Sequence, residues 1–503
     1  MNKKILWIDD EVESLKSHIL ILQGQGYLVK GVSNGEEGCD FIKKESFDLV
    51  LLDEIMPGKD GLETLNDIRK INLNVPIVMI TKSEESALVD KAYIRGVNDF
   101  LIKPLNPNQL IATCKRIFER DMLIQKGIPQ EYSKFYSQVI QQVNQGLNWE
   151  KWAALHCELS RWSIKIGQNT EVKNLHTELI QECEIAFSRF VELNYTRWMK
   201  NESSPPMFSP QLMTEYVVPQ VQEVPKVYLF IMDCMRVDQW FLIRPFLEEF
   251  FEIKETFYSS ILPSATPFAR NAIVSGLFTK DIAEKYPEWW EPESNKYESE
   301  LLEAQMQRIG IKTQYVRVKN REDEENLHKN LTSHNDSKIV TVIVNFLDYL
   351  VHAKYESMVV DELIPDMEAL RSLTVLWFSR SHVYAALKNL SREKATIILT
   401  TDHGALYAKK PSLIYGSKVI SRNLRYKYGP ALRCNPKEAL FIENPADYKL
   451  PGNSRYGIAK EDHYFIYPTH PQEYTKEYKN TFQHGGISMQ EMIIPCVTLT
   501  PKK

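Results

Sequence analysis

Cysteine is scarce in this sequence, and no two cysteines have the spacing of a thiolate metal site. Seven cysteines are spread over 503 residues without a Cys-X-X-Cys pair, so neither a thiolate zinc site nor a disulfide framework is indicated. No run approaches the roughly 20 apolar residues of a membrane span. The opening, MNKKILWIDDEVESL, meets two aspartates after a short apolar run, unlike a secretory signal. These absences predict a protein of the reducing cytoplasm.

Neither sign of charge dominates, and no internal repeat or low-complexity tract occurs. The net charge is -5, with 25% charged and 43% hydrophobic residues, which is the composition of a globular protein rather than of a nucleic-acid coat. A chain of 503 residues is too long for one ordinary domain. We therefore expect several domains.

The chain alternates between two kinds of pattern. Over residues 1–122, the apolar runs KILWIDD, YLVKGVS, FDLVLLD, PIVMIT and DFLIKP alternate with helical periods such as EESALVDKAYIRGV, which predicts a doubly wound parallel sheet. Residues 123–204 show helical spacing without a strand signal and predict an all-α bundle. The β/α pattern returns in residues 205–503, with buried strands predicted in KVYLFIMDCMR, KIVTVIVNFLDYLVH and ATIILTTDHG.

Polar side chains end four of the five predicted N-terminal strands. Asp9 and Asp10 end the first, Asp53 the third, Thr81 the fourth and Lys103 the fifth. In a parallel sheet these ends converge on one edge. Three carboxylates there repel one another and recruit a hard cation such as Mg²⁺. Thr81 and Lys103 could hold phosphoryl oxygens; the alternative is that each acid only caps a turn or helix.

Residues 1–122 resemble a response-regulator receiver domain, a flavodoxin-like fold, over their whole length. The resemblance implies that Asp53 is the phosphoacceptor, with a sensor histidine kinase as donor. It also implies homodimerisation on phosphorylation. The implied roles of the other groups are Mg²⁺ binding for Asp9, Asp10 and Asp53, a signalling pair in Thr81 and Lys103, and an aromatic switch in Phe100.

A second set of chemistry-bearing residues lies at the strand ends and turns of the C-terminal region. The set is Asp233, Thr266, Asp348, His352, Asp402, His403 and His484. Zn²⁺ takes about four N or O ligands, so six such groups and a hydroxyl suit two ions. Two metals can clamp the attacking and leaving oxygens of a phosphoryl transfer, with Thr266 as the activated nucleophile.

Each of these residues also has a plainer interpretation. Asp402 and His403 precede a glycine, as in an ordinary turn, and Thr266 could be a helix N-cap. Arg270 and Asn271 could contact phosphate oxygens from the start of a helix or only pack. No acidic residue occurs between Asp402 and Glu438, where lysines, arginines and tyrosines alternate; this stretch could track a phosphodiester backbone or be a solvated loop.

The order Asp…Thr…DxxxH…DH…H resembles the alkaline-phosphatase superfamily, and LPSATPFARNAIVSG with HGGISMQEMIIP resembles its PglZ branch. The resemblance covers about residues 225–500 and implies a di-zinc phosphatase or phosphodiesterase with Thr266 as nucleophile. It places Asp233, Asp402, His403 and the Thr266 oxygen on one zinc. It places Asp348, His352 and His484 on the other.

The full domain order is similar to that of PorX-like response regulators, which are linked to type IX secretion. This similarity implies a PglZ phosphodiesterase that cleaves linear or cyclic oligonucleotides. A sigma factor and a secretion-system membrane protein are further implied partners, with no membrane insertion of the chain itself. The alternatives are a phosphomonoesterase on the same metals, a non-catalytic partner-binding regulator, and transcriptional control by direct DNA contact.

Overall fold

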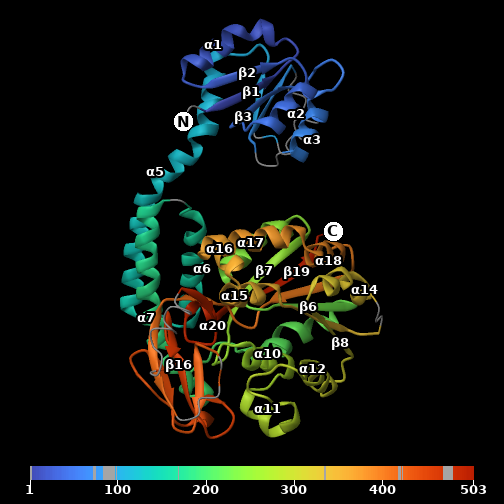
Figure 1. The fold of residues 1–503 in the computed structure, drawn as a ribbon. Coiled ribbons are helices and arrows are strands. Elements are labelled where there is room, and N and C mark those ends of the chain that lie inside the picture. Colours follow the sequence, from blue (N-terminus) through green and yellow to red (C-terminus); the bar gives the residue numbers. More distant parts are fainter. Residues whose placement is uncertain are drawn as a thin grey trace. The chain divides into compact units, whose positions relative to one another are not determined.

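The computed structural model describes residues 3–71, 75–82, 97, 99–167, 169–332, 336–416, 421, 423–467 and 480–502. The chain forms two compact units, residues 1–133 and residues 134–503 (Figure 1). Helix α5 (Pro107–Gln145) is continuous through residue 122 and contributes residues to both units. The domain divisions at 122 and 204 stay predictions. The predicted helical period at 84–97 lies outside the described residues except for Val97.

The first unit contains a parallel sheet of five strands in the order β2-β1-β3-β4-β5. The strands are β1 (Lys4–Ile8), β2 (Leu28–Val32), β3 (Leu49–Asp53), β4 (Ile77–Thr81) and β5 (Asp99–Ile102). Alternate side chains of β1 and β3 enter two separate apolar clusters, one on each face. Helices α1 (Lys16–Gly24), α2 (Gly35–Lys44) and α3 (Gly61–Ile71) connect the strands. The predicted receiver-type α/β fold is confirmed.

The middle region is helical, as the sequence predicts. It consists of the end of α5 followed by α6 (Trp149–Lys165) and α7 (Thr170–Met199). Asparagine side chains cap both later helices by accepting backbone N–H groups at their first turns. Trp152 and Phe187 meet edge to face between α6 and α7, with ring centroids 5.5 Å apart. This region belongs to the second unit.

A six-stranded sheet forms the centre of the second unit, in the order β7-β19-β10-β6-β9-β8. The strands are β6 (Lys226–Met232), β7 (Phe251–Ser259), β8 (Thr313–Val318), β9 (Ile339–Val344), β10 (Ala395–Thr400) and β19 (Ile493–Pro501). Strands β10, β6, β9 and β8 are parallel, whereas β19 is antiparallel to both of its neighbours. The three predicted buried strands are β6, β9 and β10. The segment MQEM forms the short helix α20 (Met489–Met492) before β19.

Helices cover both faces of this sheet (Figure 1). One face packs against α8 (Val237–Ile243), α14 (Leu327–Thr332), α17 (Met367–Arg380) and α18 (His382–Leu390). The other packs against α10 (Thr266–Ser275), α11 (Thr279–Lys285) and α12 (Glu298–Gln307). Strands β6, β9 and β10 are buried on both faces, which is why they read as continuous apolar runs in the sequence.

The basic and aromatic stretch after Asp402 forms short strands rather than a solvated loop. It includes β11 (Leu406–Ala408), β12 (Lys410–Tyr415) and β13 (Tyr426–Gly429). Arg425, Lys427, Tyr426 and Tyr428 are buried, so these side chains do not present a surface to a nucleic-acid backbone. Lys418 and Arg422 of the same stretch lie outside the described residues.

Among the described helices, none combines the length and the apolar character that crossing a bilayer requires.

Candidate metal centres

The carboxyl edge of the five-stranded sheet gathers the predicted receiver residues. Asp9, Asp10 and Asp53 each offer a carboxylate oxygen within 4.8 Å of the others. The ammonium group of Lys103 lies 3.1 Å from Asp9 Oδ2 and 3.0 Å from Asp53 Oδ1. Burial raises the pKa of Asp53 to about 6, although Lys103 opposes this effect. The edge therefore brings together the three carboxylates predicted to bind Mg²⁺ and the lysine predicted to bind a phosphoryl oxygen.

Thr81 ends β4, which pairs with the strand that ends in Asp53, and Phe100 lies on β5, the next strand of the sheet. The Thr81 hydroxyl donates to the carboxylate of Glu54, the residue after Asp53. Phe100 is partly buried against the apolar cluster of this face. To bind a phosphoryl group on Asp53, Thr81 must exchange its bond with Glu54. The signalling and switch roles stay predictions.

In the second unit, the predicted ligands come from five separate segments. Asp233 directly follows β6, and Asp402 and His403 follow the neighbouring strand β10. Asp348 and His352 are one helical turn apart on α15 (Phe346–Glu356), which begins after β9. His484 follows β18 (Thr481–Gln483), which pairs with β11. The parallel strands thus deliver three of the segments to one edge of the sheet.

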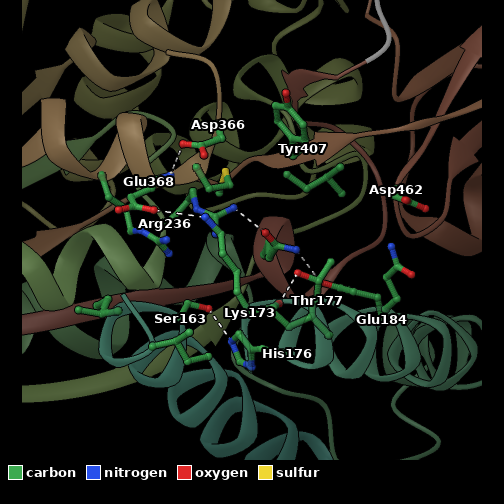
Figure 2. A pocket seen from close by; sticks show the side chains of 18 of the residues that line it. Ser163, Lys173, His176, Thr177, Glu184, Arg236, Asp366, Glu368, Tyr407 and Asp462 are labelled. Atoms are coloured by element: carbon green, nitrogen blue, oxygen red, sulfur yellow. Dashed lines mark hydrogen bonds and ion pairs between the residues drawn. The ribbon is translucent and has the colours of Figure 1, made fainter. Parts of the chain in front are cut away.

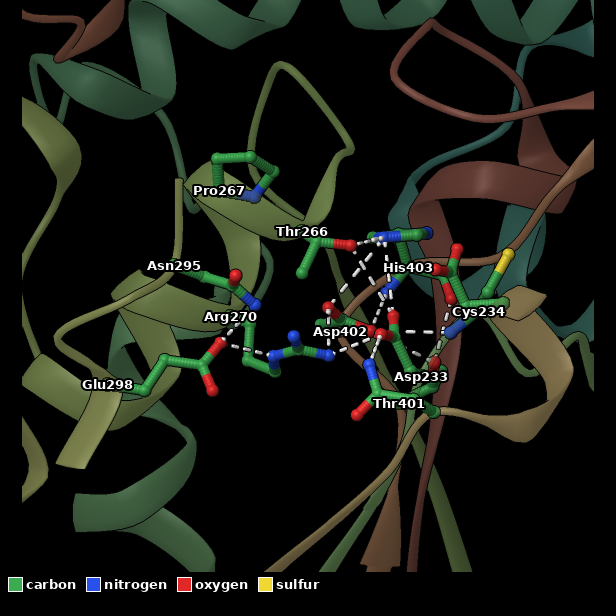
Figure 3. A network of polar contacts seen from close by, with 12 residues as sticks. Asp233, Cys234, Thr266, Pro267, Arg270, Asn295, Glu298, Thr401, Asp402 and His403 are labelled. Carbon is green, nitrogen blue, oxygen red and sulfur yellow. Dashed lines mark hydrogen bonds and ion pairs between the residues drawn. The ribbon is translucent and has the colours of Figure 1, made fainter. Parts of the chain in front are cut away.

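Asp233, Asp402 and His403 form one buried group, with ligand atoms within 4.8 Å of one another. His403 Nε2 lies 3.8 Å from Asp233 Oδ1 and 3.7 Å from Asp402 Oδ2. The hydroxyl of Thr266, the first residue of α10, lies 3.0 Å from His403 Nε2 and 3.4 Å from Asp233 Oδ1 (Figure 3). The Thr266 hydroxyl is therefore within hydrogen-bond distance of two members of this group.

Asp348, His352 and His484 form the second group. Asp348 Oδ1 lies 3.3 Å from His352 Nε2 and 3.6 Å from His484 Nε2. The two imidazole nitrogens are 3.1 Å apart. The groups adjoin, because the His403 and His484 rings stack with their centroids 4.3 Å apart. The sets predicted for the two ions are thus the two sets that the fold brings together.

The spacing within both groups fits tetrahedral metal binding. Ligands at about 2.0–2.1 Å from a tetrahedral zinc lie roughly 3.3 Å from each other. The second group's separations of 3.1, 3.3 and 3.6 Å are close to that value. In the first group, Asp402 Oδ2 is buried and makes no hydrogen bond within the described residues. Nitrogen and oxygen donors of this kind fit zinc; the ligand roles themselves stay predictions.

Burial gives the carboxylates of the two groups different proton affinities. Burial raises the pKa of Asp233 well above its usual range, and nearby Asp402 adds to the effect while Arg270 opposes it. Burial would also raise the pKa of Asp348, but His352 and His484 outweigh it and hold that pKa below its ordinary value. For His484, burial lowers the pKa well below its usual range. A neutral imidazole beside an ionised carboxylate is the state that binds a metal.

Arg270 and Asn271, predicted as possible substrate contacts, are buried. The Arg270 guanidinium lies between Asp233 and Glu298, at 2.5 Å and 2.6 Å from their oxygens (Figure 3). Asn271 donates to the backbone carbonyls of Pro267 and Ser294. In this structure both side chains bond to protein groups next to the site, and their contact with substrate stays a prediction.

Two supporting residues escaped the sequence analysis. Glu298, on α12, neutralises Arg270 and accepts from the Tyr315 hydroxyl. Asn345 donates to Asp233 Oδ2 at 2.8 Å. Neither has a spacing signal in the sequence, although Asn345 directly follows strand β9 and so lies at the same edge as the ligands.

The glycine of the Asp-His-Gly sequence is required by close packing. A Cβ at Gly404 would lie 2.0 Å from the carbonyl oxygen of Gln490, which no side chain tolerates. Gly404 also donates its N–H to the Glu491 carbonyl. The chain bends at Asp402, and the acid and imidazole of this segment lie in the first group, whereas the metal interpretation stays a prediction.

Three family models match the chain in succession. A response regulator receiver domain matches residues 5–115, a PorX response regulator linker domain matches residues 122–199, and a BREX system PglZ alkaline phosphatase-like domain matches residues 212–499. The last match contains all six residues of the two groups and Thr266.

Individual relatives resemble the N-terminal part. The CpxR homolog, a transcriptional regulatory protein of Haemophilus influenzae, is 38% identical over 117 residues, which are 23% of this chain and 51% of that protein. The alkaline phosphatase synthesis transcriptional regulatory protein PhoP of Bacillus subtilis is 31% identical over 140 residues, 28% of this chain and 58% of that protein. The chain thus spans about half the length of these curated relatives. The solved structure of the chemotaxis protein CheY4 of Vibrio cholerae is 28% identical, with a TM-score of 0.23, over 23% of this chain and 99% of that one.

The fold, the gathered acidic edge and the matched segments define a response regulator that joins a receiver, a PorX-type linker and a phosphatase-like output domain. The phosphatase-like match spans more than half of the residues, and the chain belongs to the PglZ alkaline phosphatase-like family. The alkaline phosphatase-like match indicates a hydrolase of the phosphatase superfamily that uses divalent metals, and the receiver match implies a phosphodonor such as a sensor histidine kinase.

Proposed function

We propose that this response regulator is a zinc-dependent phosphodiesterase that acts on linear or cyclic oligonucleotides. The observation that carries the proposal is the pair of adjoining ligand groups with the Thr266 hydroxyl at 3.0 Å from His403. Two zinc ions would be held by Asp233, Asp402 and His403 and by Asp348, His352 and His484. Bound there, they would lower the pKa of the Thr266 hydroxyl and offset the charge that develops on the phosphate.

The chain's own residues account for the remaining requirements of the reaction. Thr266 Oγ1 forms a bond to phosphorus while the bond from phosphorus to the leaving oxygen breaks, and water then displaces the threonine oxygen. Thr266 begins the ten-residue helix α10. Its N-terminal N–H groups and helix dipole favour an anion at this position. The buried ion pair of Arg270 with Glu298 keeps Asp233 in place.

The balance of charge in the site favours a diester over a monoester. While the Thr266 hydroxyl keeps its proton, two divalent cations and three ionised aspartates leave one net positive charge, and Arg270 is cancelled by Glu298. A phosphodiester carries one negative charge, whereas a monoester near neutral pH carries nearly two. Arg270 is 0% exposed, so in this conformation it does not meet a third phosphoryl oxygen.

Paired chromogenic esters test the substrate class directly. We expect the purified protein to hydrolyse a nitrophenyl diester and a short oligonucleotide, with a kcat/KM for the diester well above that for the monoester of the same chromophore. Turnover of the monoester alone would replace this proposal with a phosphomonoesterase. A specific duplex bound with a steep salt dependence, without turnover, would favour direct DNA control.

The receiver is proposed to control this output through Asp53, with Mg²⁺ on Asp9, Asp10 and Asp53. The PorX-type linker match supports a role in regulating type IX secretion, with a sigma factor and a secretion-system membrane protein as further partners. A phosphoryl group adds charge that Thr81 and Lys103 can hold. Recruiting Thr81 breaks its bond to Glu54 and biases the receiver toward another packing, in which it dimerises.

Asp53→Asn is expected to prevent phosphorylation-driven dimerisation. Sedimentation with beryllofluoride and Mg²⁺ should double the mass of the wild-type protein and leave the variant monomeric, because the amide cannot take the phosphoryl mimic. Asp40→Asn, on the exposed side of α2 beside Lys43, is the matched control and should dimerise normally. A wild-type protein that stays monomeric under these conditions would contradict the proposal.

A further inference from the structure

The short helix α20 connects the two loops that carry the histidines of the site. The backbone carbonyl of Glu491 accepts the N–H of Gly404, the residue after His403. The carboxylate of Glu491 accepts the N–H of Gly486, two residues after His484, at 2.8 Å. One residue of α20 therefore fixes the backbone next to a histidine of each group.

Glu491 is itself held firmly. Its carboxylate receives two bonds from the guanidinium of Arg425, at 3.0 Å and 2.6 Å, and both side chains are completely buried. Ser488 also donates to it and caps α20. Bidentate pairs of this kind define geometry as well as contributing energy. The position of α20 thus determines the position of both loops.

The linker helix α7 holds α20 through one buried carboxylate. Glu184 accepts the backbone N–H of Met489 at 2.8 Å and the side-chain amide of Gln490 at 3.1 Å. The other end of the Gln490 amide accepts from Arg236 at 2.6 Å. Arg236 also donates to the carbonyl of Ala405, two residues after His403. A continuous set of hydrogen bonds therefore runs from α7 to the His403 loop.

The interface around Glu184 is not fully packed. A cavity of about 680 Å³ lies between α6 and α7 on one side and α17, β11 and α20 on the other. Glu184 and Arg236 both line it (Figure 2). An open space beside these hydrogen bonds gives α7 room to shift against the catalytic part, whereas a close-packed interface would resist such a shift.

We propose that Glu184 is a positioning residue through which the linker helix sets the geometry of the metal centre. The proposal rests on the proposed function only for the identity of the metal. If α7 withdraws, the buried carboxylate of Glu184 loses its donors, and the N-terminus of α20 loses its acceptor. The loops carrying His403 and His484 then lose their fixed spacing, and metal binding weakens.

Metal affinity and loop exchange, measured on the full chain, test this proposal without relying on turnover. Residues that orient metal ligands change affinity by roughly 10–100-fold when replaced. We expect Glu184→Ala to weaken zinc binding by about that factor in a competition titration with a chromophoric chelator, and to alter the visible spectrum of the cobalt-substituted protein. Hydrogen exchange of the amides in 484–491 should accelerate in the metal-free variant.

Two further variants separate positioning from a general loss of stability. Glu184→Gln keeps an acceptor for the Met489 N–H, so its affinity should lie between those of the wild type and Glu184→Ala. Glu192→Gln, about two turns along α7, removes a charge from the Glu192–Lys460 pair at 2.7 Å. It should bind zinc like the wild type.

Unchanged zinc affinity, cobalt spectrum and amide exchange in Glu184→Ala would overturn the proposal. If Glu184→Ala does not fold, Glu184→Gln provides the test. Amide hydrogen exchange at 484–491 that is the same in Glu184→Gln and in the wild type would overturn the proposal equally. A wild type that binds two metals without cleaving any diester refutes the proposed activity but leaves the positioning test intact. The two failures are therefore distinguishable.

Discussion

Replacing Thr266 by valine is expected to lower kcat by up to about 10⁶-fold, the loss seen when a hydrolase loses its catalytic nucleophile. Valine has nearly the same shape as threonine, so α10 and its packing remain, but the oxygen 3.0 Å from His403 is gone. Both kcat and kcat/KM should fall together, because the lost bond forms only as the reaction proceeds. Diester turnover under saturating substrate measures the effect.

The control for this experiment is a second threonine that begins a helix. Thr279 is the first residue of α11, and its hydroxyl donates to the Lys449 carbonyl. Thr279→Val should leave turnover unchanged, and Thr266→Ser should retain a measurable rate. Wild-type turnover in Thr266→Val would remove this residue as nucleophile. Lost turnover with unaltered regulatory output in cells would show that the protein acts by docking to partners.

The meeting of the candidate ligands was predictable because a parallel sheet orders its strand ends, whereas their division between two ions came from the family resemblance. Asp233 and Asp402 follow strands that are direct neighbours, β6 and β10, and the apolar runs before them are unmistakable in the sequence. Asp348 and His352 are predictable as a pair because residues four apart share a helix face. His484 was identifiable only by its place in the family pattern, because the strand directly before it, β18, does not belong to the six-stranded sheet.

The surroundings of the site were not predictable from the sequence. Burial of Arg270 against Glu298 depends on how α12 packs on α10, and no local pattern encodes that contact. The basic stretch after Asp402 shows the same limit: its charges suggested an exposed surface, but Arg425 is completely buried because Glu491, 66 residues later, neutralises it. Composition indicates which charges exist, whereas tertiary pairing decides which of them face solvent.

Removing bound metal is expected to abolish turnover and lower the apparent Tm of the second unit by about 5–15 °C. Each metal ion at 1,000 times its Kd stabilises the protein by about 4 kcal/mol. An unfolding entropy of about 2.1 cal/mol/K per residue makes 1 kcal/mol correspond to roughly 1.3 °C for the second unit, residues 134–503, so two ions account for about 10 °C. Without cations, the buried carboxylates of Asp233 and Asp402 repel each other. Differential scanning calorimetry before and after dialysis against a chelator measures the shift, and metal analysis should give about two zincs per chain.

Replacing one ligand should show how much of the bound zinc and of the Tm shift on chelation belongs to each group. Asp348→Asn removes the only carboxylate of the group that contains His352 and His484, so about one zinc should remain, at the site of Asp233 and His403. The shift of Tm on chelation should fall by about half, whereas Asp336→Asn, at an exposed aspartate, should behave as the wild type. Two zincs retained in Asp348→Asn would contradict the assignment of this group. If chelation leaves both the Tm and the turnover unchanged, metal binding at both groups is contradicted. Carboxylates this deeply buried cannot release an essential cation without a cost in stability.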